Sequence, residues 1–215
     1  MTLVFPRDFP DCRANHTAEF VPQYFMARSV TGGSLPQVIQ LAPPIWRASY
    51  SVETLDREDT GTWEAWLHSL RAGLRTFKAT PPKGRWPRAY PRGFTGLTVS
   101  GVAFTGSGTL TAIGTNRDEV TIGSLPVGFK IALGDWFSLN VGSRHHLHRF
   151  VEAATASGSG VVSTVSIEPP LRPNAVTSTA ALFAAPYCEM VLSGDWSSRR
   201  NGAGASISFE AAQVL

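Results

Sequence analysis

Cysteine and long hydrophobic runs are both scarce in this 215-residue chain. Its two cysteines, Cys12 and Cys188, are too few for a disulfide scaffold, so we expect two free thiols, with one bridge between them as the alternative. No apolar run approaches the roughly 20 residues that cross a bilayer as a helix. Residues 1–8 lack the basic and apolar regions of a signal peptide. These absences predict a protein made in a reducing cytoplasm, with no membrane span.

Charged residues are also few, because they make up 16% of the chain against about a quarter in an average soluble domain. The 20 glycines and 15 prolines are plentiful by comparison, and this balance favours short strands, tight connections and a surface that a partner covers. Only Lys78, Lys83 and Lys130 are lysines among 19 basic residues. An arginine bias is typical of permanent interfaces, but a GC-rich genome produces the same bias, and both explanations stay open.

The net charge of +3 is small and is spread along the chain. Proteins that grip nucleic acid carry a dense basic stripe that neutralises successive phosphates. This sequence has none, so we expect no specific nucleic-acid partner.

The first 54 residues carry the pattern of strands. The stretch 20–28 reads as one strand, and the runs 37–41 and 46–52 read as two consecutive strands with a turn at Pro43-Pro44 between them. In the second run, alternate residues form one apolar face: Trp46, Ala48, Tyr50 and Val52.

One helix is predicted, starting after Asp56. This residue is a good N-cap, and Glu58 and Asp59 follow in the first turn, where the helix dipole favours negative charge. Gly73 is suited to end the helix, and 74–80 then reads as a strand. Apolar residues recur with helical spacing at Trp63, Trp66, Leu67 and Leu70.

Residues 81–93 form a Pro- and Arg-rich arm without a regular element. We place a domain boundary at its end. Basic and aromatic residues alternate along it: Arg85, Trp86, Arg88, Tyr90 and Arg92. These residues are candidates for contact with a neighbouring subunit, where Trp, Tyr and Arg carry much of the binding energy. The alternative, stacking on single-stranded nucleic acid, would weaken steeply with salt.

Residues 94–185 have a different sequence pattern, in which short β-like runs are separated by Gly-containing or polar turns. Six such runs at close spacing indicate a small barrel or sandwich. The runs are 109–114, 119–122, 136–141, 146–153, 161–167 and 179–183.

The closing segment 186–215 contains two further runs, 189–192 and 205–211, and the second alternates cleanly between apolar and polar residues. Its partner is expected in the opening region. The fold class is then mainly β: residues 1–93 and 186–215 form a β-sandwich domain with one α-helix, and 94–185 form an inserted small β-barrel domain.

Side chains with catalytic or metal-binding potential cluster only at Arg144-His145-His146-Leu147-His148. His146 and His148 lie two residues apart on a strand and point the same way, as two metal ligands would. No further ligand stands at suitable spacing, so packing is the favoured interpretation. The thiols lack an activating context, and the carboxylates near Asp56 are explained by helix capping. We expect no enzymatic activity, no catalytic residue, no cofactor and no metal.

Several motifs resemble tail proteins of siphophages and prophages from alphaproteobacteria. They are Pro44-Ile-Trp-Arg-Ala-Ser-Tyr50, Trp63-Glu-Ala-Trp-Leu67, Leu70-Arg-Ala-Gly-Leu-Arg-Thr-Phe77, Gly134-Asp-Trp136, Leu147-His-Arg-Phe-Val-Glu-Ala153, Ser197-Ser-Arg199 and Ile207-Ser-Phe-Glu-Ala-Ala-Gln-Val214. The overall plan is similar to that of distal tail proteins. In that family the second domain is often OB-like or galectin-like, although it is C-terminal there and is expected as an insertion here.

The resemblance implies a structural virion protein at the phage tail tip or baseplate, made in the host cytoplasm. Its subunits would form a ring, hexameric as in that family, between the tail tube protein and the baseplate hub or fibres. Candidate contact elements are residues 1–36, the arm 81–93, and the helix face with Trp63 and Trp66. For that helix face the favoured alternative is that both tryptophans pack in the core of their own subunit and do not contact a neighbour.

Two other functions remain as hypotheses. The first is a carbohydrate- or host-surface-binding module, in which Trp136 and Phe137 stack on a glycan. The second is a small hydrolase or metal enzyme that uses the His cluster.

Overall fold

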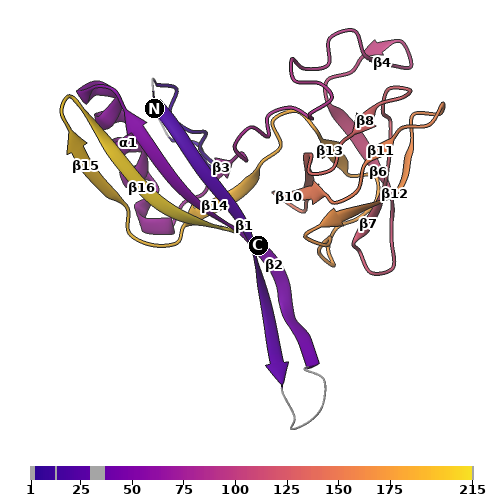
Figure 1. The fold of residues 1–215 in the computed structure, drawn as a ribbon, viewed down its shortest axis with the longest axis horizontal. Coiled ribbons are helices and arrows are strands. Elements are labelled where there is room, and N and C mark those ends of the chain that lie inside the picture. Colours follow the sequence, from indigo (N-terminus) through magenta and orange to yellow (C-terminus); the bar gives the residue numbers. More distant parts are fainter. Residues whose placement is uncertain (1–2, 13, 30–36, 215) are drawn as a thin grey trace.

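The computed structural model describes residues 3–12, 14–29 and 37–214. The protein is mainly β, as expected, with several sheets and, among the described residues, one α-helix. Figure 1 shows two bodies and a long hairpin that extends away from both of them. The C-terminus lies near the base of this hairpin.

The first body is built on a six-stranded sheet from both ends of the sequence. Its order is β1-β2-β16-β14-β3, and β15 pairs with β16. The strand bounds are β1 (Ala14–Ser29), β2 (Gln37–Thr54), β3 (Phe77–Ala79), β14 (Cys188–Leu192), β15 (Ser197–Asn201) and β16 (Gly204–Gln213). Since β16 lies between β2 and β14, the predicted pairing of the last strand with the opening region is confirmed.

The strand β2 corrects one prediction and confirms another. It runs unbroken through Pro43 and Pro44, where the sequence predicts a turn. The pairing register with β1 shifts at this point, and β16 reaches along β2 only as far as Arg47. Proline is tolerated there because a bulge on an unpaired edge requires no backbone N–H donor. The predicted apolar face is buried: Trp46, Ala48, Tyr50 and Val52 are each at most 3% exposed.

The predicted helix is present as α1 (Arg57–Ser69), and it covers one face of the sheet. The side chain of Asp56 caps it by accepting a hydrogen bond from the backbone N–H of Asp59, at 2.8 Å. The α-helix ends earlier than expected, and a 3-10 turn, η1 (Arg71–Gly73), follows. Gly73 ends that turn with a φ of +95°, which a side chain would disfavour.

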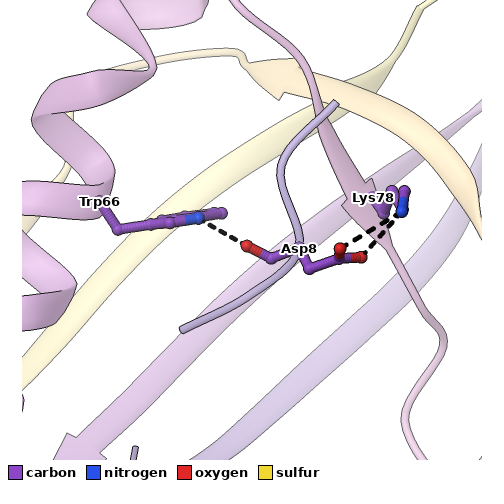
Figure 2. A network of polar contacts seen from close by, with 3 residues as sticks. All are labelled: Asp8, Trp66 and Lys78. Atoms are coloured by element: carbon purple, nitrogen blue, oxygen red, sulfur yellow. Dashed lines mark hydrogen bonds and ion pairs between the residues drawn. The ribbon is translucent and has the colours of Figure 1, made fainter. Parts of the chain in front are cut away.

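The N-terminal segment packs against this core next to the helix, where Phe9 contacts Trp63 and Trp66. The backbone carbonyl of Asp8 accepts a hydrogen bond from Trp66 Nε1 at 2.8 Å, and the Asp8 carboxylate pairs with Lys78 at 3.1 Å (Figure 2). Arg7 forms a parallel bridge with Phe77, so the β3 edge of the sheet is occupied. These contacts hold part of the expected contact element 1–36 against the chain itself.

The second body contains a closed sheet in the order β10-β12-β7-β6-β13-β9. Each of the six predicted runs coincides with one of these strands. The bounds are β6 (Ser107–Ile113), β7 (Glu119–Gly123), β9 (Trp136–Val141), β10 (Arg144–Phe150), β12 (Val162–Glu168) and β13 (Ala180–Leu182). Four two-residue strands form two small pairs beside it: β4 (Thr98–Val99) with β5 (Val102–Ala103), and β8 (Lys130–Ile131) with β11 (Ala154–Thr155).

The buried apolar residues divide into two clusters that follow the two bodies. Leu147 is the exception, because it lies on β10 but packs in the core of the first body. Its carbonyl accepts a hydrogen bond from Trp46 Nε1 at 2.7 Å, and Trp46 meets Trp136 edge to face at 5.0 Å. The base of the hairpin is therefore packed against both bodies.

Candidate functional site

The most unusual surface of the molecule is the distal half of the β1–β2 hairpin, residues 20–29 and 37–45. We call it the distal ribbon. Its large apolar side chains are widely exposed: Val21 50%, Tyr24 40%, Met26 44%, Val38 53%, Ile39 62% and Leu41 69%. Val38 and Ile39 are adjacent on β2, so their exposed side chains lie on opposite faces of the ribbon.

The distal ribbon has almost no charge. Within residues 20–29 and 37–45, Arg28 is the only charged residue. Natural proteins usually protect exposed strand edges with charged residues, short strands or prolines. Here the two prolines of β2 lie at the base of the ribbon, next to buried Trp46, and leave the outer part unprotected.

The distal ribbon is also open at both edges among the described residues. The first strand, β1, is the terminal strand of the sheet, so its outer edge has no partner. On the other side, β16 pairs with β2 only from Arg47 to Glu53. A free two-stranded ribbon is marginally stable in water, and it is stabilised by a further strand or by a packed surface. An open, apolar ribbon of this kind is a candidate surface for pairing with a further strand.

The arm 81–93 is folded onto the second body. Tyr90 stacks on Phe129 with ring centroids 4.8 Å apart, and its hydroxyl accepts a hydrogen bond from the backbone N–H of Lys130 at 2.9 Å. Trp86 meets Phe94 edge to face at 5.3 Å. The arm aromatics are therefore half-buried against the chain's own core.

The arginines of the arm behave differently from its aromatic residues. Arg85, Arg88 and Arg92 are exposed, and none forms an ion pair within the described part of the chain. The guanidinium groups of the arm thus remain available for contact with another molecule.

Trp63 and Trp66 are not part of this surface. Each is 2% exposed, and they pack edge to face with ring centroids 5.5 Å apart inside the first core. This corrects their place among the candidate interface residues: the helix face is satisfied within the subunit, so it is not a surface anchor. Phe137, offered as a glycan contact, is likewise fully buried.

The His cluster lies at the junction of the two bodies. Arg172 Nε donates a hydrogen bond to His146 Nδ1 at 3.1 Å, and His148 Nδ1 is 2.7 Å from the carbonyl of Pro169. The carbonyl accepts, so the His148 proton is on Nδ1. A guanidinium next to His146 opposes a cation at that nitrogen. Across residues 3–12, 14–29 and 37–214, no three His, Cys, Asp or Glu side chains are grouped as metal ligands would be.

The electrostatics of this junction keep both histidines neutral. Burial, followed by the nearby His148 and Arg172, lowers the pKa of His146 to about 3. Burial also lowers the pKa of His148 to about 4, against a smaller opposing effect of the hydrogen bond to Pro169. The side chains serve to join the two bodies, because Arg172 also donates to the carbonyl of Pro44 at 3.3 Å.

The two cysteines are free thiols in this structure. Cys188 is fully buried, and burial raises its pKa far above the ordinary value. Burial and the nearby Asp59 carboxylate raise the pKa of Cys12. Neither thiol has the lowered pKa of an activated nucleophile.

No helix within the described residues is long and apolar enough to cross a membrane. No protein-family model matches the chain, and no curated protein matches it. We therefore infer the function from the surfaces described above.

The candidate contact element 1–36 includes residues 20–29 of the distal ribbon, but residues 37–45 and their pairing into one ribbon were not predicted as a site. The signal was present, since the two runs carry one charge between them and several large apolar residues, but the prolines led us to expect a turn at the place where the ribbon leaves the body. The position of Arg149 near the arm, although it is far along the chain, was not predicted either.

Proposed function

We propose that this protein is a non-enzymatic structural subunit of a phage tail tip, which assembles with copies of itself into a ring between the tail tube and the baseplate hub or fibres. The ring is hexameric by analogy with distal tail proteins. The single observation that supports the proposal most is the distal ribbon: an apolar hairpin with one charged residue and two open edges, which extends from a well-packed body.

The first physical argument concerns the solvent. Monomeric proteins rarely leave a large contiguous apolar patch exposed, and such patches are typical of interaction surfaces. Val38, Ile39 and Leu41 are each more than half exposed on one strand. Burial of a large aliphatic side chain contributes about 1.5–3 kcal/mol, so covering this strand yields a substantial association energy.

The second argument concerns the geometry of a repeated contact. The open edge of the sheet is at β1, whereas the β3 edge is occupied by Arg7. If the β1 edge paired with β1 of a second copy, the contact would close a twofold dimer, so a ring requires that the ribbon meet a different surface of the next copy. A contact between unlike surfaces repeats from copy to copy, and it closes into a ring when the rotation per subunit divides a full turn.

In this arrangement the two domains have different roles. Residues 1–93 and 186–215 act as a ring-forming domain of β-sandwich type with one helix, and residues 94–185 act as an inserted small β-barrel domain, OB-like or galectin-like, displayed at the side of the ring. The hydrogen bond from the Ala185 N–H to the Arg85 carbonyl, at 2.7 Å, supports this division because it brings the two connections together.

Charge placed on the ribbon tests the proposal. The double variant Ile39→Lys with Leu41→Lys should remain folded, because both side chains are exposed, and should sediment as a monomer under conditions where the unmodified chain forms the ring. The measurement is sedimentation velocity across a range of protein concentrations.

The matched control is Val102→Lys with Val176→Lys, since these valines are 71% and 64% exposed but lie on the second body. The control should keep the oligomer. A ribbon variant that assembles like the unmodified chain would remove the support for a ring. Antibody labelling of intact particles then tests the location, and labelling away from the tail tip would contradict it.

A further inference from the structure

A pocket of about 440 Å³ lies between the arm and the second body, next to the base of the hairpin. Three basic side chains line it: Lys83 and Arg88 from the arm, and Arg149 from β10. Its volume is within the range of small-ligand sites. The residues come from positions more than 60 apart in the sequence, so the pocket is a product of the arm's docking on the second body.

Two guanidinium groups converge on one point in this pocket. An ideal Cβ built on Gly134 would lie 3.0 Å from Arg149 Nη2 and 3.3 Å from Arg88 Nη2. Gly134 has a φ of +87°, a conformation that glycine adopts readily. The glycine therefore turns the chain and leaves room for both groups, and like charges held this close favour an anion between them.

The carboxylate in the pocket wall does not neutralise them. Asp135 is 3% exposed, and its two oxygens accept hydrogen bonds from the backbone N–H groups of Arg88, at 3.0 Å, and Ala132, at 2.9 Å. It fixes the arm and the turn in place, but it balances only one of three positive charges. The two ion pairs found in the described residues, Lys78–Asp8 and Arg144–Glu189, do not involve the pocket.

The basic character continues around the pocket rim. Lys130 shares a neighbouring hollow with Arg88, and Arg85 shares another with Arg88 and Lys83. Arg88 lies at the centre of this group. The surface thus offers a positive rim as well as a positive pocket, which suits a chain of repeated anionic units.

The aromatic side chains in and near the pocket distinguish between two kinds of anion, a nucleic acid and an anionic sugar. Trp136 and Phe20 line the pocket together with the cations, and the Arg149 guanidinium lies 5.1 Å from the centroid of the Trp136 ring. Trp136 therefore also orients one of the two arginines. Trp86 and Tyr90, the residues that would stack on bases, are packed on Phe94 and Phe129. Along the arm, a nucleic acid would therefore find phosphate contacts without a series of free rings for successive bases, whereas one anionic sugar ring needs a single carboxylate clamp and a single apolar wall.

We propose that this pocket binds an anionic saccharide residue, with its carboxylate between Arg88 and Arg149 and its ring against the wall formed by Trp136 and Phe20. Arg149 Nε donates to the Gly134 carbonyl at 3.1 Å, so Arg149 offers its two Nη groups to a carboxylate, as Arg88 does. This inference goes beyond the ring, since it assigns a host-surface or matrix polysaccharide unit to a pocket whose basic side chains lie outside the distal ribbon.

The test uses tetragalacturonate, which carries four carboxylates, and its methyl ester, which carries none. Titration calorimetry or NMR should show binding of the acid, and a loss of affinity of about tenfold or more with the ester. Arg88→Ala should weaken binding of the acid by a similar factor. The fold should survive because the Arg88 backbone N–H, not its side chain, holds Asp135.

The control is Arg200→Ala, an exposed arginine on β15 of the first body, which should bind as the unmodified chain does. Equal affinity for the acid and the ester would overturn the proposal. So would inorganic sulfate that competes as well as the tetramer, or an oligothymidylate that binds more tightly. Sedimentation of the Arg88→Ala variant keeps the two proposals separate, because the ring should form whether or not the pocket is intact.

Discussion

The two halves of one hairpin differ more than any two elements of this protein. Near the body, β2 carries Trp46, Tyr50 and Val52 into a core with less than 4% exposure, and neighbouring strands pair with it on both sides. Farther out, Val38, Ile39 and Leu41 of the same strand are more than half exposed. The proximal half has the partners that a strand needs, and the distal half has the composition of a core strand without them.

This difference teaches that hydrophobic composition alone does not locate a core. Both halves are strongly apolar, but only the proximal half receives β16 and α1 from the same chain. We propose that a partner covers the distal half, which would explain its apolar composition. Mutations at matched residues in the two halves should therefore act on different equilibria, folding in one and association in the other.

The largest effect is expected at the base of the hairpin. Trp46→Ala removes a buried indole, its hydrogen bond to Leu147 and its contact with Trp136. We expect a loss of about 3–5 kcal/mol in the free energy of unfolding, measured by denaturant titration of the monomer. A loss below about 1 kcal/mol would show that the hairpin base does not join the two bodies.

The next effect is a dependence on pH at the same junction. His146 and His148 are neutral in the folded chain, with pKa values of about 3 and 4, but take up protons near pH 6.5 when unfolded. The unfolded state therefore binds more protons below pH 6.5, and stability falls as the pH drops from 6.5 toward 4. We expect a loss on the order of 2 kcal/mol from each histidine between pH 7 and pH 4.5.

Denaturant titration at the two pH values measures this loss, and His148→Phe should reduce it by about half. The variant fills the same buried space next to Phe137 without a titrating group. A pH dependence that is identical in the variant would show that His148 is not buried in its neutral form.

The smallest effect is expected for two valine-to-alanine variants of β2. They compare the proximal and distal halves most directly, because the residue type and the strand are the same. Val52→Ala should reduce the stability of the monomer by about 1–2 kcal/mol, since Val52 is completely buried. Val38→Ala should leave it within about 0.5 kcal/mol, since Val38 is 53% exposed. Val38→Ala should instead weaken the oligomer, as sedimentation equilibrium would show. Equal effects on monomer stability would remove the distinction between the two halves.

Much of the fold could be predicted because its signals are local. The alternation from Trp46 to Val52 requires a strand with one buried face, and Asp56 with two acidic residues in the next turn requires a helix start. The six strands of the closed sheet were predicted for the same reason, since each is bounded by turn residues. The strand β15 was not predicted, because its polar sequence is held only by pairing with β16.

The distal ribbon and the basic pocket depend on contacts between residues far apart in the sequence, which a local sequence pattern does not predict. The prolines in β2 favour a turn, and only the absence of a second neighbour on that edge allows the strand to continue. The arm appears irregular and free in the sequence, but Tyr90 fixes it on Phe129. That docking is what brings Arg88 near Arg149, so the pocket follows from the tertiary fold.

Hydrogen exchange of backbone amides tests the central claim most directly, because it reports on the distal ribbon itself. Amides that face the open edges of residues 20–29 and 37–45 should exchange rapidly in the dilute monomer and should become protected when the chain assembles, while those of β16 should be protected in both forms. Equal, rapid exchange of the ribbon in monomer and assembly would contradict the claim that a second copy covers it.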